Sequence, residues 1–198
     1  MNIAVVIPCY KVRKHILSLL GSIGSEVESI YVIDDCCPQH SGQLVLDCNR
    51  DRRIKVLFNS ENTGVGGAVM KGYVEALQDG MDIIIKIDGD GQMDPALIPK
   101  LIKPILLGQA DYTKGNRFHR IESLVLMPAV RKVGNAILSF VNKFSSGYWK
   151  IMDPTNGYTA IHRAALLCLP LEKISQRYFF ESDMLFRLGT IRAVVRDI

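Results

Sequence analysis

A short apolar run that ends in two carboxylates constrains this chain more than any other feature. Residues 83–87 are isoleucine at four of five positions, and Asp88-Gly89-Asp90 follows directly. Such a run, bounded by Asp and Gly, is typical of a strand buried in a parallel sheet. Open α/β sheets bind their ligands at the carboxyl ends of their strands, so we expect Asp88 and Asp90 to lie at that edge.

Two neighbouring carboxylates repel each other unless a cation lies between them. Oxygen ligands of this kind suit Mg²⁺ or Mn²⁺, which is typically held by one or two carboxylates together with substrate phosphates. Asp88 and Asp90 are therefore candidate metal ligands, and Gln92 could add a third oxygen directly or through water. The simpler alternative is a polar turn at a strand end, because Asp and Gly are ordinary turn residues.

The spacing tests two other interpretations of this stretch. An EF-hand loop is excluded, since the sixth and twelfth positions counted from Asp88 hold Met93 and Pro99. A phosphatase with an aspartyl nucleophile would also place Asp-x-Asp after a strand. That interpretation stays open, although Gln92 stands where such enzymes usually have Thr.

Length, charge and cysteine usage restrict the class of protein. The 198 residues fit one domain, and the net charge of +4 without a basic arm argues against nucleic acid and suits an anionic substrate or membrane surface. Five cysteines without CxxC spacing indicate reduced thiols of a cytoplasmic protein, and there is neither a signal peptide nor a membrane-length apolar run. Residues 193–198 resemble a strand just begun, so we expect domain 1–198 to be truncated at its C-terminus.

Strand-like and helix-like segments alternate along the chain. This alternation predicts an α/β fold with a Rossmann-like, mostly parallel, doubly wound sheet flanked by helices. The expected strands are 2–7, 30–33, 54–58, 83–87 and 111–114, followed by one that begins near 158; the expected helices include 12–23, one ending near 78, 124–144 and 178–188.

A glycine-rich turn at residues 62–67 precedes one of these helices. It is not a P-loop, and it is not a dinucleotide fingerprint, because Val69 stands at the third glycine position. A helix N-terminus reached through glycines can still receive an anion, which makes Gly66 a candidate substrate contact. A tight strand–helix connection is the simpler alternative.

Seven segments in this order resemble the family 2 inverting glycosyltransferases of the GT-A fold. Within that family the resemblance is to the dolichol-phosphate mannose synthase and polyprenyl-phosphate sugar transferase branch. The segments are VVIPCY (5–10), VIDDCCPQHSG (32–42), NTGVGGAVMKGY (62–73), IDGDGQMDP (87–95), KGNRF (114–118), DPTNGYTAIHR (153–163) and YFFESDML (178–185).

The resemblance implies a nucleotide pocket near the N-terminus. Pro8, Tyr10 and Asp35 correspond to that pocket, with Asp35 accepting an N–H of the base and Tyr10 packing on it. Asp34 could assist, although capping of the following turn explains it equally well.

The resemblance also assigns residues to the diphosphate, the metal and the acceptor. Asp88 and Asp90 match the DxD motif that holds the cation and the sugar nucleotide, and Gln92 matches a glutamine common in the branch. Arg117 and Arg131 stand where the branch places phosphate-facing arginines, and a guanidinium fork suits a phosphate acceptor.

The implied enzyme is a metal-dependent hexosyltransferase that uses a UDP- or GDP-sugar. A single displacement at the anomeric carbon inverts its configuration and delivers the sugar to a polyprenyl phosphate, such as dolichyl or undecaprenyl phosphate, at the cytoplasmic face of a membrane. That acceptor is already ionised and needs no strong base, so Asp153 would position the sugar or the acceptor.

Several alternatives to this enzyme stay open. A saccharide hydroxyl acceptor, as in cell-surface polysaccharide synthesis, would need a base, for which Asp153 is favoured over Glu181 and Asp183. A sugar nucleotidyltransferase would need an N-terminal glycine-rich loop that residues 4–11 lack. A non-catalytic sugar-nucleotide-binding module would keep the fold without the chemistry.

Overall fold

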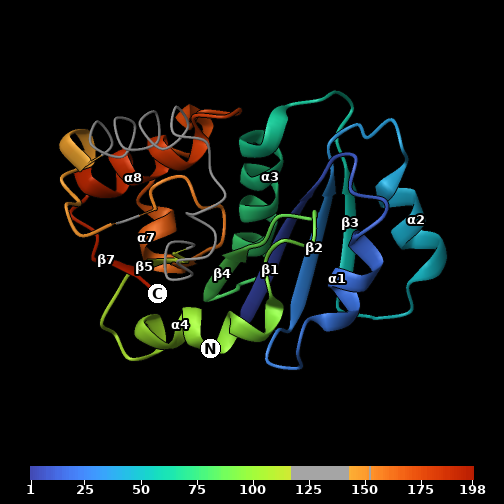
Figure 1. The fold of residues 1–198 in the computed structure, drawn as a ribbon, viewed down its shortest axis with the longest axis horizontal. Coiled ribbons are helices and arrows are strands. Elements are labelled where there is room, and N and C mark those ends of the chain that lie inside the picture. Colours follow the sequence, from blue (N-terminus) through green and yellow to red (C-terminus); the bar gives the residue numbers. More distant parts are fainter. Residues whose placement is uncertain (117–142, 152) are drawn as a thin grey trace, which may run out of the picture.

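A central sheet with helices on both faces organises the structure (Figure 1). The structure is a computed structural model, and it describes residues 1–116, 143–151 and 153–198. Within these residues the sheet has seven strands in the order β3-β2-β1-β4-β6-β5-β7. The strands are β1 (Ile3–Cys9), β2 (Ser29–Asp34), β3 (Ile54–Phe58), β4 (Ile83–Lys86), β5 (Tyr112–Lys114), β6 (Thr159–His162) and β7 (Val195–Asp197).

The sheet is mostly parallel, as the sequence predicts. Strands β1 to β4 run parallel, and β5 runs parallel to β7. Strand β6 is antiparallel to both of its neighbours, β4 and β5, and the prediction of a mostly parallel sheet did not identify this strand as the exception. The β4–helix–β5 connection leaves a gap one strand wide, and β6 fills it later in the chain. Alternation of apolar residues carries no information on strand direction, so the sequence pattern could not show this.

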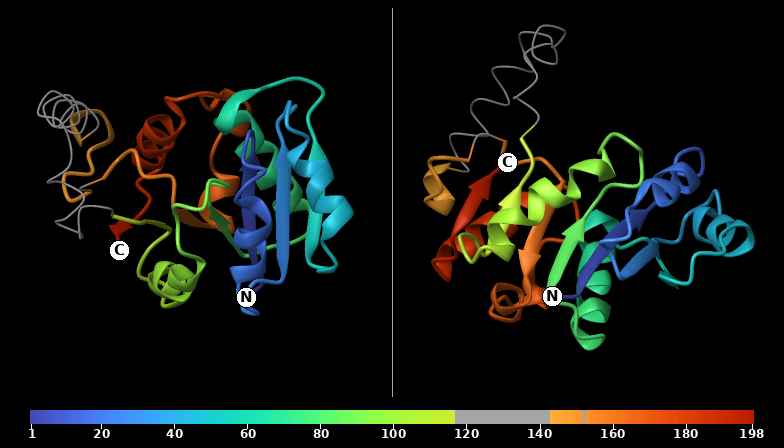
Figure 2. Two further views of the ribbon diagram at one scale, coloured as in Figure 1. Left: turned by 45° about the vertical axis from the view of Figure 1, so that its right-hand side comes forward. Right: turned by 90° about the horizontal axis from the view of Figure 1, so that it is seen from below.

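Helices cover both faces of the sheet (Figure 2), and one apolar core lies on each face. One core is covered by α1 (Ile16–Ser22), α2 (Ser41–Cys48) and α4 (Ile98–Leu106), which follows a 3₁₀ turn at Pro95–Leu97. The other is covered by α3 (Gly64–Gln78), α7 (Arg163–Leu167) and α8 (Phe180–Thr190). Strand β1 alternates its side chains between the two cores, which is why its sequence reads as continuously apolar.

Several predicted boundaries shift. The helix expected over 12–23 is the shorter α1, because Lys11 adopts φ +59° and residues 12–15 form a turn. The helix expected over 178–188 is α8, and the strand expected over 193–198 is β7. Most of the helix expected over 124–144 lies outside the described residues. Among the described helices, none combines the length and apolar character needed to cross a bilayer.

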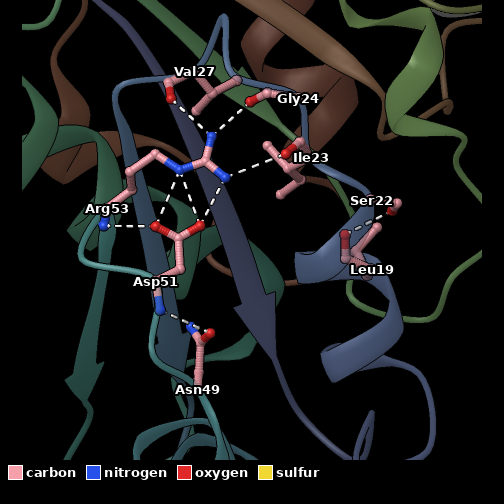
Figure 3. A network of polar contacts seen from close by, with 8 residues as sticks. All are labelled: Leu19, Ser22, Ile23, Gly24, Val27, Asn49, Asp51 and Arg53. Atoms are coloured by element: carbon pink, nitrogen blue, oxygen red, sulfur yellow. Dashed lines mark hydrogen bonds and ion pairs between the residues drawn. The ribbon is translucent and has the colours of Figure 1, made fainter.

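Arg53 fastens the start of β3 to the loop between α1 and β2 (Figure 3). Its Nε and Nη2 bind the carboxylate of Asp51 at 2.7–3.1 Å. Its Nη1 donates to the carbonyls of Gly24 (2.6 Å) and Val27 (3.0 Å), and Nη2 also donates to Ile23 (3.2 Å). All five N–H groups of the guanidinium are thereby used inside the protein, which identifies Arg53 as a structural clamp.

Two lysines are fully buried within the sheet. Lys86 on β4 and Lys114 on β5 have no exposed surface, and alternation along the strands directs both towards the α3 and α8 side. The Lys114 ammonium donates a hydrogen bond to the carbonyl of Asn156. Burial lowers the pKa of Lys114 to about 8, although the attraction of Glu181 opposes part of this shift.

The substitution Arg53→Lys should lower the free energy of unfolding by about 1–3 kcal/mol, because one ammonium cannot serve a carboxylate and three carbonyls. Arg52→Lys is the matched control, since Arg52 is exposed and adjacent. Urea unfolding of the three proteins measures the difference. Equal midpoints for the two variants would contradict the clamp.

The substitution Lys114→Met should change the dependence of stability on pH. The ammonium titrates at about 8 in the folded chain and near 10.5 in the unfolded chain. Between pH 8 and pH 10.5, Lys114 carries a proton in the unfolded chain but not in the folded chain. The free energy of unfolding therefore rises with pH in this range because of this group. The variant should lose that contribution, which is at most about 1.4 kcal/mol per pH unit.

Urea unfolding of wild type and variant from pH 7 to 9.5 provides the measurement. The difference between the two proteins is the observable, because groups such as Cys9, whose pKa burial raises to about 12, act equally in both. A difference that stays constant across this range would refute the assignment.

Candidate functional site

A cleft of about 570 Å³ lies at the carboxyl ends of β1, β2 and β4. Its volume is within the range of ligand-binding pockets. Its walls come from the turns after these strands, the start of α3 and the segment before α8. The lining residues are Pro8, Cys9, Tyr10, Val12, Asp35, Asn62, Gly64, Val65, Ala68, Asp88, Gly89, Asp90, Arg177 and Tyr178.

The loop after β4 turns so that both of its carboxylates line this cleft. The N–H of Asp88 donates to the sulfur of Met93 at 3.3 Å, and the N–H of Gln92 donates to Oδ1 of Asp90 at 3.0 Å. Gly91 supplies the left-handed backbone, φ +76°, that closes this turn. The strand-end position predicted for Asp88 and Asp90 is thus the one observed.

Lys86 lies directly beneath Asp88. Its Nζ is 2.8 Å from Oδ1 of Asp88 and 3.1 Å from Oε1 of Glu181 on α8. Burial disfavours the charged lysine, but the two carboxylates outweigh this effect and raise the pKa of Lys86 above its ordinary value. A Cβ at Gly157 would stand 2.4 Å from both Lys86 Nζ and Asp88 Oδ2, so any larger residue would have to displace the end of one of these side chains.

Asp35 links the cleft to the start of α3. Its Oδ1 accepts hydrogen bonds from the side chain of Asn59 and from the N–H and hydroxyl of Thr63, each at 2.8 Å. Its Oδ2 accepts from the N–H of Gly64 at 2.8 Å. The carboxylate is therefore held in one orientation while it forms part of the cleft wall.

Asp34 and Gly66, two of the predicted substrate contacts, have other partners. Asp34 accepts from the N–H groups of Cys37 (2.7 Å) and Gly42 (2.6 Å), so it caps the turn after β2. Gly66 donates to the carbonyl of Gln176 at 2.8 Å. A Cβ at Gly66 would stand 2.3 Å from the carbonyl oxygen of Ser175, so this glycine permits close packing of the segment before α8.

The start of α3 does not offer the anion site that its glycines suggested. The N–H of Gly64 donates to Asp35, and those of Gly66 and Gly67 donate to Gln176. These donors have partners within the protein, which favours a tight strand–helix connection, and the substrate contact of Gly66 stays a prediction.

Two further predicted site residues, Gln92 and Asp153, do not line the cleft that the described residues form. Gln92 is exposed, and Asp153 is buried near Lys114, with the Thr155 hydroxyl 3.4 Å from its Oδ1. Arg117 and Arg131 lie outside the described residues. The roles expected for these four residues stay predictions.

The other two base candidates on α8 are already engaged. Glu181 pairs with Lys86. Asp183 accepts from the N–H of Ser175 at 2.7 Å and from Nε of Arg187 at 2.9 Å, which fixes the segment before the helix.

Sequence reasoning missed four residues at or beneath the cleft. Arg177 lines its wall from the segment before α8, and Tyr178 and Asn62 line it from two of the quoted motifs. Lys86 lies beneath the cleft, within the apolar run 83–87. A lysine within an otherwise isoleucine run was the available signal for Lys86. Arg177 immediately precedes a recognised segment, and a basic residue there could have been tested as a phosphate contact.

The donor set in the cleft is compatible with a divalent cation. Asp88 and Asp90 present two hard carboxylates, and Mg²⁺ commonly uses one or two such groups with phosphate oxygens and water. In the part of the chain that the structure describes, no group of three His, Cys, Asp or Glu side chains could hold a metal unaided. A metal at this position would therefore depend on a ligand for further oxygens.

Two proteins of known activity are similar to most of this chain. The UDP-N-acetylglucosamine–dolichyl-phosphate N-acetylglucosaminyltransferase of Methanococcus voltae is 28% identical over 190 residues, which cover 89% of this chain and 75% of that protein. The undecaprenyl-phosphate mannosyltransferase of Micrococcus luteus is 28% identical over 195 residues, which cover 96% and 79%.

A solved structure and a family model complete the comparison. Glucosyl-3-phosphoglycerate synthase from Mycobacterium tuberculosis, crystallised with Mn²⁺, UDP and phosphoglyceric acid, superposes with a TM-score of 0.71 at 20% identity. The match covers 99% of this chain and 67% of that one, and it supports the fold. The model of glycosyl transferase family 2 matches residues 4–169. The chain therefore belongs to glycosyl transferase family 2 and has the GT-A fold.

Proposed function

We propose that this chain transfers a sugar from a UDP- or GDP-sugar to a polyprenyl phosphate, with inversion and with the help of Mg²⁺ or Mn²⁺. The observation that carries the proposal is one cleft lined by Asp88 and Asp90 together with Tyr10 and Asp35. Similar proteins from Methanococcus voltae, Micrococcus luteus and Pyrococcus furiosus are named as transferases of dolichyl phosphate, undecaprenyl phosphate and dolichol phosphate, respectively.

The base and ribose would occupy the end of the cleft formed by β1 and β2. Tyr10 is 42% exposed there, and the Lys11 ammonium stands 5.1 Å from its ring centroid. A ring so placed offers a flat apolar face on which a nucleobase can pack. Asp35, held by Thr63 and Gly64, would accept an N–H of the base.

The diphosphate would lie between the β4 loop and the segment before α8. Asp88 and Asp90 would hold the divalent cation, which supplies positive charge to the leaving diphosphate. Arg177 lies on the wall formed by the segment before α8, and its guanidinium can donate to phosphate oxygens. The sugar would then extend towards the acceptor with its anomeric carbon exposed to in-line attack.

A phosphate acceptor fits the state of the acidic residues. An ionised phosphate oxygen needs no strong base, and none of the three base candidates is a free carboxylate in the cleft. Glu181 pairs with Lys86, Asp183 pairs with Arg187, and Asp153 is buried. Asp153 would act by positioning the sugar or the acceptor. Arg117 and Arg131 would bind the acceptor phosphate, and the protein would act peripherally at the cytoplasmic face of a membrane.

The substitution Asp90→Asn should weaken Mn²⁺-dependent binding of the donor on the order of 100-fold, because a ligand of the cation loses its charge. Calorimetry with a panel of UDP- and GDP-sugars, with and without chelator, measures this loss and names the donor. Asp47→Asn, on the exposed face of α2, is the control for removal of one carboxylate. Metal-independent binding of equal strength in both variants would refute the metal site.

The same samples test the acceptor. Wild type should move radiolabelled sugar from the donor so identified to undecaprenyl or dolichyl phosphate in vesicles. Transfer to a saccharide hydroxyl, with none to the lipid phosphate, would instead establish the alternative acceptor.

The substitution Gly157→Ala should weaken donor binding in the presence of Mn²⁺ by about tenfold, with the fold retained. The added methyl group would displace the Asp88 carboxylate from its position above Lys86. Gly21→Ala is the matched control, because a Cβ there meets nothing within 4 Å. Calorimetry alongside thermal unfolding separates loss of binding from loss of structure, and unchanged binding would show that the position of Asp88 is not critical.

A further inference from the structure

The buried ammonium of Lys86 connects Glu181 on α8 to Asp88 in the loop after β4. Lys86 has no exposed surface, and its Nζ contacts Asp88 at 2.8 Å and Glu181 at 3.1 Å. The side chain of Asp88 is 31% exposed, whereas that of Glu181 is 15% exposed. One carboxylate of the pair therefore faces the cleft, and the other lies deeper in the protein.

The surroundings hold the ammonium in this position. Gly157 lies so close that a Cβ would stand 2.4 Å from Nζ. The ring of Phe180 lies 5.8 Å from Nζ on the α8 side. Water has little access to a group that is fully buried, so the positive charge of Lys86 is shared mainly between the two carboxylates.

This sharing affects how Asp88 can bind a cation. Lys86 and a divalent cation would compete for the negative charge of the same Asp88 carboxylate. A stronger Lys86–Asp88 ion pair therefore means weaker binding of the metal by Asp88. Glu181 neutralises part of the lysine charge and so reduces that competition. Its removal would leave the full charge of Lys86 directed at Asp88.

We propose that Glu181 is a positioning residue that acts through Lys86 and sets the affinity of the Asp88–Asp90 pair for the divalent cation. This inference rests on the proposed function, because it concerns the metal of that same site. Glu181 touches neither the cation nor the donor in this arrangement. Its role differs from that of the general base considered for it from the sequence.

The test is Mn²⁺ binding measured by electron paramagnetic resonance, with UDP present and without any turnover. The substitution Glu181→Gln should weaken Mn²⁺ binding on the order of tenfold, since contacting charges couple by amounts of this size. Asp47→Asn is the control for removal of one carboxylate, because Asp47 is exposed on α2 and contacts Gln43 instead of Lys86. Its Mn²⁺ affinity should stay within about twofold of wild type.

The double variant Lys86→Met/Glu181→Gln separates action through Lys86 from direct attraction. With the competing ammonium gone, Mn²⁺ binding should return at least to the wild-type level. If Glu181 acted directly on the cation, or only on the fold, the double variant would bind Mn²⁺ no better than Glu181→Gln. Thermal unfolding of each variant verifies that folded proteins are compared.

The outcomes distinguish this inference from the proposed function. If the wild type binds Mn²⁺ and Glu181→Gln binds it equally well, the inference alone is overturned. The same holds if Glu181→Gln and the double variant both bind Mn²⁺ weakly. Failure of the wild type to bind Mn²⁺ with UDP overturns the metal-dependent function and the inference together. Weaker Mn²⁺ binding in Glu181→Gln, together with recovered Mn²⁺ binding in the double variant, supports both the inference and the metal-dependent function.

Discussion

The burial of the Lys86 ammonium is the constraint on which the site depends. An ammonium without water or a partner would cost several kcal/mol, so the fold must bring carboxylates to it. Asp88 follows two residues later in the loop after β4, while Glu181 lies on α8, 95 positions further along the chain. Gly157, two residues before β6, closes the remaining side. The antiparallel β6 thus has a function beyond completing the sheet, because it brings Gly157 against the ion pair.

The acidic residues at the carboxyl edge of the sheet divide into two groups. Asp34 and Asp183 accept backbone N–H groups and hold the turns that shape the cleft. Asp88 lines the cleft itself, and Asp35 and Asp90 do both, because each lines the cleft and also accepts a backbone N–H. Residue type and proximity to a strand end cannot separate these groups. The separation depends on where each carboxylate points, which the turn geometry decides.

Local pattern explains how far the sequence could predict this molecule. Strands β1 to β4 and the strand-end position of Asp88 and Asp90 follow from short apolar runs that end in Asp, Gly or Pro. The antiparallel β6 and the contact of Lys86 with Glu181 depend on packing between distant segments, for which no local pattern exists. Gly66 shows the reverse case, since a glycine-rich turn suggested an anion site and instead serves the approach of Gln176.

Charge balance in the cleft gives a physical reason for the metal. Asp35, Asp88 and Asp90 line it, and among its described lining residues Arg177 carries the one basic side chain. Three carboxylates against one guanidinium leave an excess of negative charge, although hydrogen bonds from Thr63 and Gly64 compensate Asp35 in part. Lys86 offsets some of the charge on Asp88 but shares its own with Glu181. The proposed binding of a nucleoside diphosphate would add further negative charge, so it would need an additional cation, for which Asp88 and Asp90 are the proposed ligands.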